Sequence, residues 1–287
     1  MSRVSGQPPG ATPTPIPVES IEDPRVAVFR DLRDRDALGR HGVFIAEGDL
    51  VVRRLLAESP FTARSVFLSE ARYAAMRGFL GEHAAHVPVY VAPQAVLDEV
   101  AGFHLHRGAL AAGDRPDDTG VADLIRPLDP ANRRATVVVL EDLANHDNVG
   151  GIFRSASAFG ALGVILTRRC ADPLYRKATR VSIGSTLTLP YARCDRATNA
   201  IAELHDAGFI TLALTPDASA TPITAWLSAH PSPGRRALLL GAEGAGLSRA
   251  ALDAATARVR LGRMVGVDSL NVAVAAGVAL HALAESG

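Results

Sequence analysis

Short apolar runs alternate with amphipathic segments along the first third of the chain. The apolar runs predict strands, and the segments between them, with apolar residues at helical intervals, predict helices. The predicted strands cover residues 42–48, 63–68, 88–91 and 108–112, and the predicted helices cover residues 23–40, 49–58, 70–83 and 93–100. Strands that alternate with helices over about ninety residues predict a compact α/β domain.

A second series of apolar runs begins with the β-branched stretch at residues 135–140. Further runs cover residues 163–166, 209–214, 237–240 and 259–261, with helical segments at 149–159 and 197–207 between them. This pattern predicts a parallel sheet with helices on both faces. In such sheets ligands bind at the carboxyl ends of the strands, so the loops after Leu140, Leu214 and Leu240 are the places to look for a site.

The spacing of proline and glycine divides the chain. Residues 1–20 contain five prolines and no apolar signal-peptide core, which predicts a disordered tail. Residues 21–113 form the first predicted domain and residues 135–287 the second. Residues 114–134 hold three prolines around a short helical piece, and we interpret them as a linker.

The composition is 48% hydrophobic and 21% charged, as in soluble globular proteins. No run reaches the roughly eighteen apolar residues that a membrane span needs, so we expect a protein that is not embedded in a membrane. The two cysteines, Cys170 and Cys194, predict neither a disulfide framework nor a zinc site. These features favour a cytoplasmic location.

The net charge is zero, so the overall charge does not indicate a polyanionic partner. Lys177 is the one lysine among thirty basic residues, and the abundance of arginine therefore carries no argument by itself. Five basic residues nevertheless crowd one short segment: Arg168, Arg169, Arg176, Lys177 and Arg180. Such a cluster would attract the phosphates of RNA, and a solvated surface is the alternative.

The end of the chain combines a glycine-rich loop with an apolar helix. The loop at Gly241 to Gly246 follows an apolar run, and glycine lets a main chain approach a ligand closely. Residues 269–283 are apolar on every side, which predicts a helix that is buried all round, against its own domain and, as one alternative, a second subunit. We place the start of this helix at Ser269 and Asn271 in its first turn.

A further set of polar residues lies in the segment from Asn145 to Arg154. Asn148 is the predicted N-cap of the helix that follows, and Arg154 lies six residues further on, away from the predicted buried face. Each feature alone also has a purely structural explanation: the asparagine as a helix cap, Arg154 as a surface residue, and the glycines at 241–246 as a tight turn. The glycine order is not that of a dinucleotide fingerprint.

Taken together, three segments resemble the signature motifs of the SpoU family of RNA ribose 2′-O-methyltransferases. They are residues 148–160, 241–248 and 268–275, in that order. This family belongs to the SPOUT superfamily, so the resemblance implies an α/β fold with a trefoil-knotted, parallel-sheet C-terminal domain. The first domain resembles the L30e-like substrate-binding domain of many members, through residues 44–48 and 106–110.

The resemblance also implies a methyl donor, S-adenosylmethionine, and roles for particular residues. Donor-binding positions fall on Gly241, Gly246, Leu261 and Leu270, with Thr215 as a further candidate. Catalytic and substrate-contacting positions fall on Asn148, Arg154, Glu243, Ser269 and Asn271. No metal is implied. Because relatives are dimers, the resemblance predicts a homodimer through the C-terminal domain.

The family casts Arg154 as the residue that activates the ribose hydroxyl. A guanidinium is hard to deprotonate, so we interpret Arg154 as orienting a phosphate and stabilising the developing oxyanion. The chain departs from the family pattern in having Leu261-Gly262-Arg263 in place of Ile-Pro-Met, Ala242 in place of asparagine, and a glycine shifted to Gly266. Gly262 makes its loop less rigid than proline would, which bears on donor affinity.

The favoured function is therefore methyl transfer from S-adenosylmethionine to a ribose 2′-hydroxyl of ribosomal RNA, since an added L30e-like domain is more typical of enzymes that act on rRNA. The same reaction on tRNA stays open. A non-catalytic RNA-binding protein that keeps the fold is the competing hypothesis. A nucleotide-dependent metabolic enzyme is more remote because the sequence has no phosphate loop, and we interpret His104 and His106 as structural.

Overall fold

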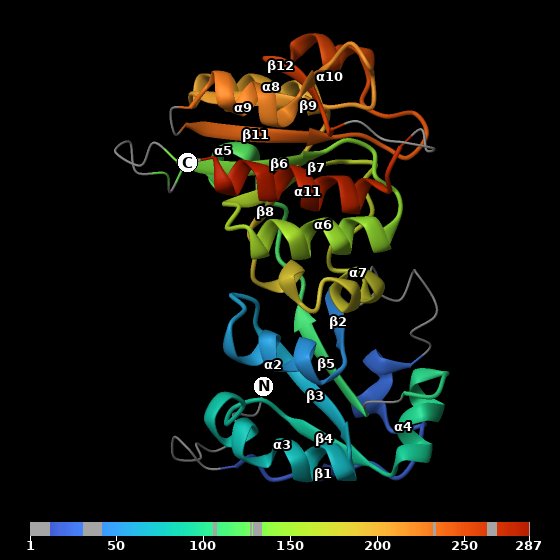
Figure 1. Ribbon diagram of the computed structural model, residues 1–287. Coiled ribbons are helices and arrows are strands. Elements are labelled where there is room, and N and C mark those ends of the chain that lie inside the picture. Colours follow the sequence, from blue (N-terminus) through green and yellow to red (C-terminus); the bar gives the residue numbers. More distant parts are fainter. Residues whose placement is uncertain are drawn as a thin grey trace. The chain divides into compact units, whose positions relative to one another are not determined.

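The computed structural model describes residues 12–30, 42–105, 108–126, 128, 134–231, 234–262 and 269–286. By its internal contacts the chain divides into two compact units (Figure 1). The first unit is Met1–Pro116 with Leu174–Thr188, and the second is Asp117–Pro173 with Leu189–Gly287.

The first unit contains a five-stranded sheet in the order β1-β4-β3-β5-β2, as far as its residues are described. The strands are β1 (Ile16–Pro17), β2 (Val43–Glu47), β3 (Ala63–Ser69), β4 (Val89–Ala92) and β5 (Ala109–Asp114). Strands β1 and β3 run parallel to β4, whereas β5 runs antiparallel to both β2 and β3. The helices are η1 (Pro24–Phe29), α2 (Asp49–Ala57), α3 (Glu70–His83) and α4 (Gln94–Ala101).

Residues 12–20 belong to this fold, so the predicted disordered tail is wrong for them. Strand β1 pairs with β4, and Val18 is buried. The Tyr73 hydroxyl donates a hydrogen bond of 3.0 Å to the Pro13 carbonyl. A proline-rich segment can join a sheet in this way because β1 is an edge strand, where a missing N–H breaks no ladder. Residues 1–11 lie outside the described residues.

The helix predicted at residues 23–40 is a 3₁₀ helix, η1, over its first part. Its buried residues are Val26 and Phe29, two of the apolar positions on which the prediction rested. Residues 31–41 lie outside the described part of the chain.

The second unit contains a seven-stranded sheet in the order β10-β12-β9-β11-β6-β7-β8 within the described residues. The described strands of this sheet all pair in parallel. The strands are β6 (Ala135–Leu140), β7 (Gly163–Thr167), β8 (Tyr191–Cys194), β9 (Phe209–Leu214), β10 (Thr221–Pro222), β11 (Arg235–Leu240) and β12 (Ala257–Arg260). The helices are α5 (Val121–Ile125), α6 (His146–Ala158), α8 (Ala197–Asp206), α9 (Ile223–Ala229), α10 (Arg249–Ala254) and α11 (Val272–Glu285).

Helices cover both faces of this sheet, and alternate strand residues serve two cores. Val138 and Leu140 of β6 pack with α6, α9 and α11 in one core. Val137 and Val139 of the same strand pack with α5, α8 and α10 in the other. This period-two division explains why the strands are almost continuously apolar. The prediction of an α/β fold with a parallel sheet is confirmed.

The order of the strands creates a switch point between β6 and β11. From β6 the chain moves to β7 and β8 on one side, and it later returns to place β11 on the other side. Loops that follow the two strands therefore diverge from neighbouring carboxyl ends, the usual ligand-binding position in such sheets. The Glu141 N–H donates a hydrogen bond of 2.9 Å to the Leu240 carbonyl at this point.

The observed division differs from the predicted domain borders in two places. Residues 174–188, with α7 (Arg176–Val181) and η2 (Ser185–Leu187), lie in the first unit although we assigned them to the second domain. Helix α5 of the predicted linker packs in the core of the second unit. The trefoil knot and the L30e likeness stay predictions.

Each helix among the described residues is too short or too polar to cross a bilayer. The same residues include no group of three or more histidine, cysteine or acidic side chains arranged to hold a metal ion.

Candidate active site

Helix α6 brings Asn148 to the switch point. The N-cap is Asn145, whose side chain accepts a hydrogen bond of 2.8 Å from the Asp147 N–H. The prediction that Asn148 is the cap is therefore wrong by one turn, because Asn145 is an equally good cap residue. Asn148 lies instead in the first turn with its side chain buried. A buried amide needs hydrogen-bond partners, and these come from two distant segments.

Helix α11 starts at a second asparagine. The Asn271 side-chain oxygen accepts hydrogen bonds from the N–H groups of Ala273 at 2.9 Å and Val274 at 3.3 Å. Asn271 is thus the N-cap, and the prediction that the helix starts at Ser269 is wrong. Within one chain helix α11 is only partly covered, because Val274 and Val278 are 54% and 48% exposed, and burial against a second subunit stays a prediction.

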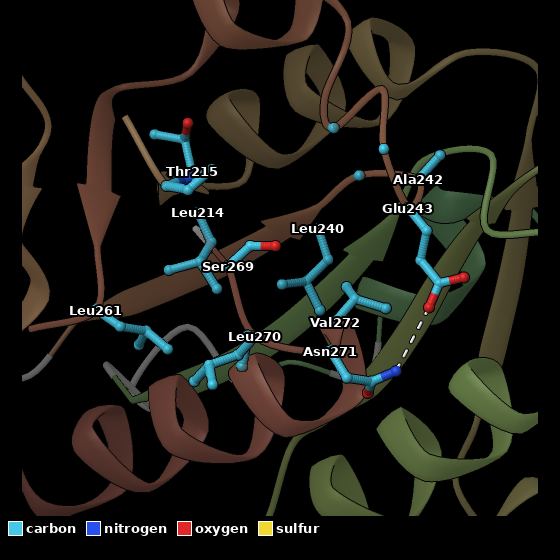
Figure 2. Close-up of a pocket in the computed structure, with 15 residues that line it drawn as sticks. Leu214, Thr215, Leu240, Ala242, Glu243, Leu261, Ser269, Leu270, Asn271 and Val272 are labelled. Carbon is cyan, nitrogen blue, oxygen red and sulfur yellow. Dashed lines mark hydrogen bonds between the residues drawn. The ribbon is translucent and has the colours of Figure 1, made fainter. Parts of the chain in front are cut away.

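Three side chains from the three motifs are joined by hydrogen bonds. The Asn148 Nδ2 donates to Glu243 Oε1 at 2.5 Å, and the Asn271 Nδ2 donates to Asn148 Oδ1 at 2.9 Å. Asn271 Nδ2 also lies 3.4 Å from Glu243 Oε1, the contact drawn as a dashed line in Figure 2. Both amide groups are therefore fixed in orientation at the carboxyl end of the sheet.

The glycine-rich loop after β11 folds back on itself. The Gly246 N–H donates a hydrogen bond of 2.8 Å to the Ala242 carbonyl, and Gly244 and Gly246 have φ values of 81° and 70°. A Cβ on Gly241 would lie 2.1 Å from the backbone of Gly246 and Leu247. Residue 241 must be glycine for this closure, since the obstacle is backbone that cannot move aside.

Glu141 fastens the far end of the same loop. Its carboxylate accepts hydrogen bonds from the Ser248 N–H at 2.7 Å and the Ser248 hydroxyl at 2.8 Å. Ser248 also caps α10. Because the Glu141 backbone is bonded to Leu240, this one residue holds both ends of the loop.

The loop, the segment before α11 and the loop after β9 enclose a cavity of about 410 Å³ (Figure 2). Small-molecule sites are commonly about 300–1,000 Å³. All five predicted donor-binding residues line this cavity: Thr215, Gly241, Gly246, Leu261 and Leu270. Glu243, Ser269 and Asn271 line it as well, so the hydrogen-bonded asparagine–glutamate cluster lies at its wall.

Residues 135–281, which span the second sheet and this cavity, match the family model described as the SpoU rRNA Methylase family. The chain belongs to this family. It is therefore an RNA methylase by descent, and the family predicted from the three motifs is confirmed.

Relatives of this SpoU-family chain extend over both units. It is 42% identical over 270 residues to an uncharacterized tRNA/rRNA methyltransferase of Mycobacterium tuberculosis, covering 93% of this chain and 90% of the relative. It is 31% identical over 223 residues to the 23S rRNA (guanosine-2′-O-)-methyltransferase RlmB of a Burkholderia species, covering 77% and 87% of the two chains.

A crystal structure shares the fold. The AdoMet-bound rRNA methyltransferase of Sinorhizobium meliloti matches with a TM-score of 0.77 at 24% identity, over 94% of this chain and 97% of the other. The likeness therefore covers the fold of nearly the whole chain.

Arg154 lies on α6, exposed, six residues beyond Asn148 in the SpoU-family chain. It makes no hydrogen bond or ion pair with any residue that the structure describes. Within these residues Glu243 accepts a hydrogen bond from Asn148 and makes none with Arg154. The Arg154 guanidinium is exposed, and Arg154 is not among the described residues that line the cavity.

The predicted RNA-binding cluster is divided between the two units. Arg168 and Arg169 lie in the second unit with highly exposed side chains, paired with Asp195 and Asp142. Arg176 and Arg180 lie in the first unit, where both pair with the buried Glu47. Lys177, between them on α7, is exposed.

Neither cysteine is suited to act as a nucleophile. Burial raises the pKa of the Cys194 thiol to about 12 and also raises the pKa of Cys170. Both therefore remain protonated at neutral pH, and the thiolate is the reactive form.

Sequence reasoning missed two residues that shape the site. Glu141 directly follows the first strand of the second sheet, and Arg260 ends β12. An acid immediately after a parallel strand was a usable signal for Glu141, because strand ends carry the site. Nothing in the local sequence distinguishes Arg260 from the other arginines.

Proposed function

We propose that this chain transfers the methyl group of S-adenosylmethionine to a ribose 2′-hydroxyl of RNA, with ribosomal RNA as the favoured substrate. The observation that carries the proposal is the hydrogen-bonded cluster of Asn148, Glu243 and Asn271 at the wall of the glycine-loop cavity. Three separate motifs meet there, and each supplies one member.

The cavity suits the donor. Leu214, Leu240 and Leu261 supply apolar surface, and the close backbone turn at Gly241 supplies main-chain groups for polar recognition. When bound, S-adenosylmethionine supplies an electrophilic methyl group on a sulfonium. Gly241, Gly246, Leu261 and Leu270 would cradle it by backbone, and Thr215 lines the same cavity.

The side chains of the site would act on the hydroxyl that attacks. A ribose 2′-hydroxyl must lose its proton as it attacks in line, so the site must stabilise negative charge on that oxygen. Arg154 holds a neighbouring phosphate and stabilises the oxyanion, a role that a permanently charged guanidinium can fill. Asn148, fixed by Glu243 and Asn271, presents an oriented amide, and Ser269 holds ribose or donor hydroxyls.

The relatives support the choice of substrate. The Burkholderia relative is named as a guanosine-2′-O-methyltransferase of 23S rRNA, and the mycobacterial relative as a tRNA/rRNA methyltransferase. We therefore favour rRNA over tRNA. Arg168, Arg169, Lys177 and Arg180 are exposed cations for the RNA backbone, although Arg168, Arg169 and Arg180 are also paired with Asp195, Asp142 and Glu47. Arg176 is mostly buried in its pair with Glu47.

The proposal includes a homodimer and a cytoplasmic location. Val274 and Val278 on α11, with Leu270 just before its N-cap, are exposed apolar side chains that are better covered by a second copy than by water. The two cysteines are free among the described residues, which suits a reducing compartment.

Two binding measurements separate the enzyme from the competing hypothesis of a non-catalytic RNA-binding protein. Calorimetry with S-adenosylmethionine is expected to show a saturable site, and RNA binding is measured on the same preparation. RNA binding without any donor binding would favour the non-catalytic alternative. Replacing Arg154 with alanine should leave donor binding intact and remove methyl transfer, and an unchanged rate would refute its assigned role.

A further inference from the structure

The side chain of Arg260 donates hydrogen bonds to two backbone carbonyl groups. Its Nε donates a hydrogen bond of 3.0 Å to the Ala220 carbonyl, and its Nη1 donates one of 3.2 Å to the Leu261 carbonyl. The guanidinium is partly buried, and both acceptors are neutral. Hydrogen bonds from a charged donor are stronger than those between neutral groups.

Both carbonyls belong to segments that line the cavity. Leu261 lines it directly. Ala220 ends the loop whose first residues, Thr215 and Pro216, line the same cavity, and the Thr215 N–H donates a hydrogen bond of 2.9 Å to the Val259 carbonyl. Through its two hydrogen bonds, Arg260 at the end of β12 links the loop from Thr215 to Ala220 with Leu261.

Gly262, the residue after Leu261, has few contacts with other described residues that could fix its conformation. Gly262 is exposed, and a Cβ added there would meet no atom within 4 Å. Glycine has the greatest backbone freedom of any residue, whereas a proline in its place would also restrict the residue before it. The conformation of Leu261 must then be set by something other than residue 262.

We propose that Arg260 is a positioning residue for the methyl donor. By binding the Leu261 and Ala220 carbonyls it holds these two cavity-lining segments in the binding conformation, and so replaces the stiffness that Gly262 lacks. This inference rests on the proposed function, because the ligand concerned is S-adenosylmethionine. Preorganising a site improves affinity by lowering the ordering cost of binding.

The first test is calorimetry of S-adenosylmethionine with Arg260→Met, which keeps the aliphatic stem and removes every donor. We expect the Kd to rise about tenfold, which corresponds to about 1.4 kcal/mol. The matched control is Arg258→Met on the same strand, whose guanidinium binds the Leu252 carbonyl and Asp253 away from the cavity. The control should leave the Kd unchanged.

The second test is rescue by Gly262→Ala in the Arg260→Met background. Alanine has open space at this position and removes unbound conformations, so it should recover about two- to fivefold of the lost affinity. In the presence of Arg260 the same change should have a smaller effect. Equal effects in both backgrounds would contradict a shared role for the two residues.

Kinetics distinguish positioning from general damage. Arg260→Met should raise the KM for the donor and leave kcat near the wild-type value at saturating donor. A wild-type chain that binds no donor would refute the proposed function itself. A wild-type chain that binds donor as tightly as Arg260→Met does would refute only the role of Arg260.

Discussion

Asn271 donates a hydrogen bond of 2.9 Å to the side-chain oxygen of Asn148 while its own oxygen caps the last helix. One residue thus couples the start of α11 to the first turn of α6. The two helices also touch closely, since a Cβ on Gly151 of α6 would lie 3.0 Å from the Cβ of Ala273. Asn271 therefore has two roles, as the cap of α11 and as a hydrogen-bond donor in the site, and different substitutions can separate them.

Asn271→Asp is expected to keep the cap of α11 and to lose the hydrogen bond to Asn148 in the site. A carboxylate caps a helix as well as an amide does, but it cannot donate to Asn148 and it places a second negative charge near Glu243. Methyl transfer should fall by at least about tenfold while the melting temperature stays close to the wild-type value. Asn271→Ala should lose both the helix cap and methyl transfer, and the free energy of unfolding should fall by about 1 kcal/mol. Equal activity of the wild type and Asn271→Asp would contradict the site role.

Gly241→Ala should abolish donor binding, because its Cβ would overlap the backbone of Gly246 and Leu247. We expect the Kd for S-adenosylmethionine to rise by more than about tenfold in calorimetry. Gly262→Ala is the matched control, since a Cβ there meets open space. If both substitutions had the same small effect, the close turn at Gly241 would not be what forms the cavity wall.

Glu141→Gln tests the fastening of the glycine loop. The change removes the charge and one acceptor for Ser248, so the loop should loosen and the donor Kd should rise about threefold to tenfold. Asp253→Asn, which weakens the exposed ion pairs of Asp253 with Arg249 and Arg258, serves as the control and should leave donor binding unchanged. An effect of the same size in both variants would point to a general loss of stability.

Val278→Glu tests the proposed dimer. Val278 is 48% exposed on α11, and a carboxylate buried in an apolar interface without a partner is strongly unfavourable. Sedimentation velocity should show a dimer for the wild type and a monomer for the variant. Ala254→Glu, at an exposed position of α10, should remain dimeric. A monomeric wild type at micromolar concentration would remove this part of the account.

The sequence predicted the second sheet well because its strands are continuously apolar and lie between recognisable turns. The strand predicted at residues 135–140 has the bounds of β6, and the one at 209–214 has those of β9. Strand β8 was missed because Tyr191–Cys194 is short and contains Arg193. The unit to which α7 belongs could not be predicted, since its ion pairs with Glu47 span about 130 residues of sequence.

The motifs located the site, but local rules misplaced its details. Asn145 and Asn148, or Ser269 and Asn271, are equally good caps by residue type, and only tertiary contacts select between them. The uniformly apolar sequence of α11 indicates a helix buried on every side, whereas one chain covers only part of it. The roles of Glu141 and Arg260 depend on carbonyl and N–H groups from other loops, which no local pattern reveals.

Methyl transfer is measured by incubating the protein with labelled S-adenosylmethionine and rRNA or tRNA pools, followed by nucleoside mapping. We expect label in rRNA, carried on a ribose 2′-oxygen, and none with Arg154→Ala. Label confined to a base, or absent from both RNA pools with folded wild-type protein that binds the donor, would contradict the proposed function.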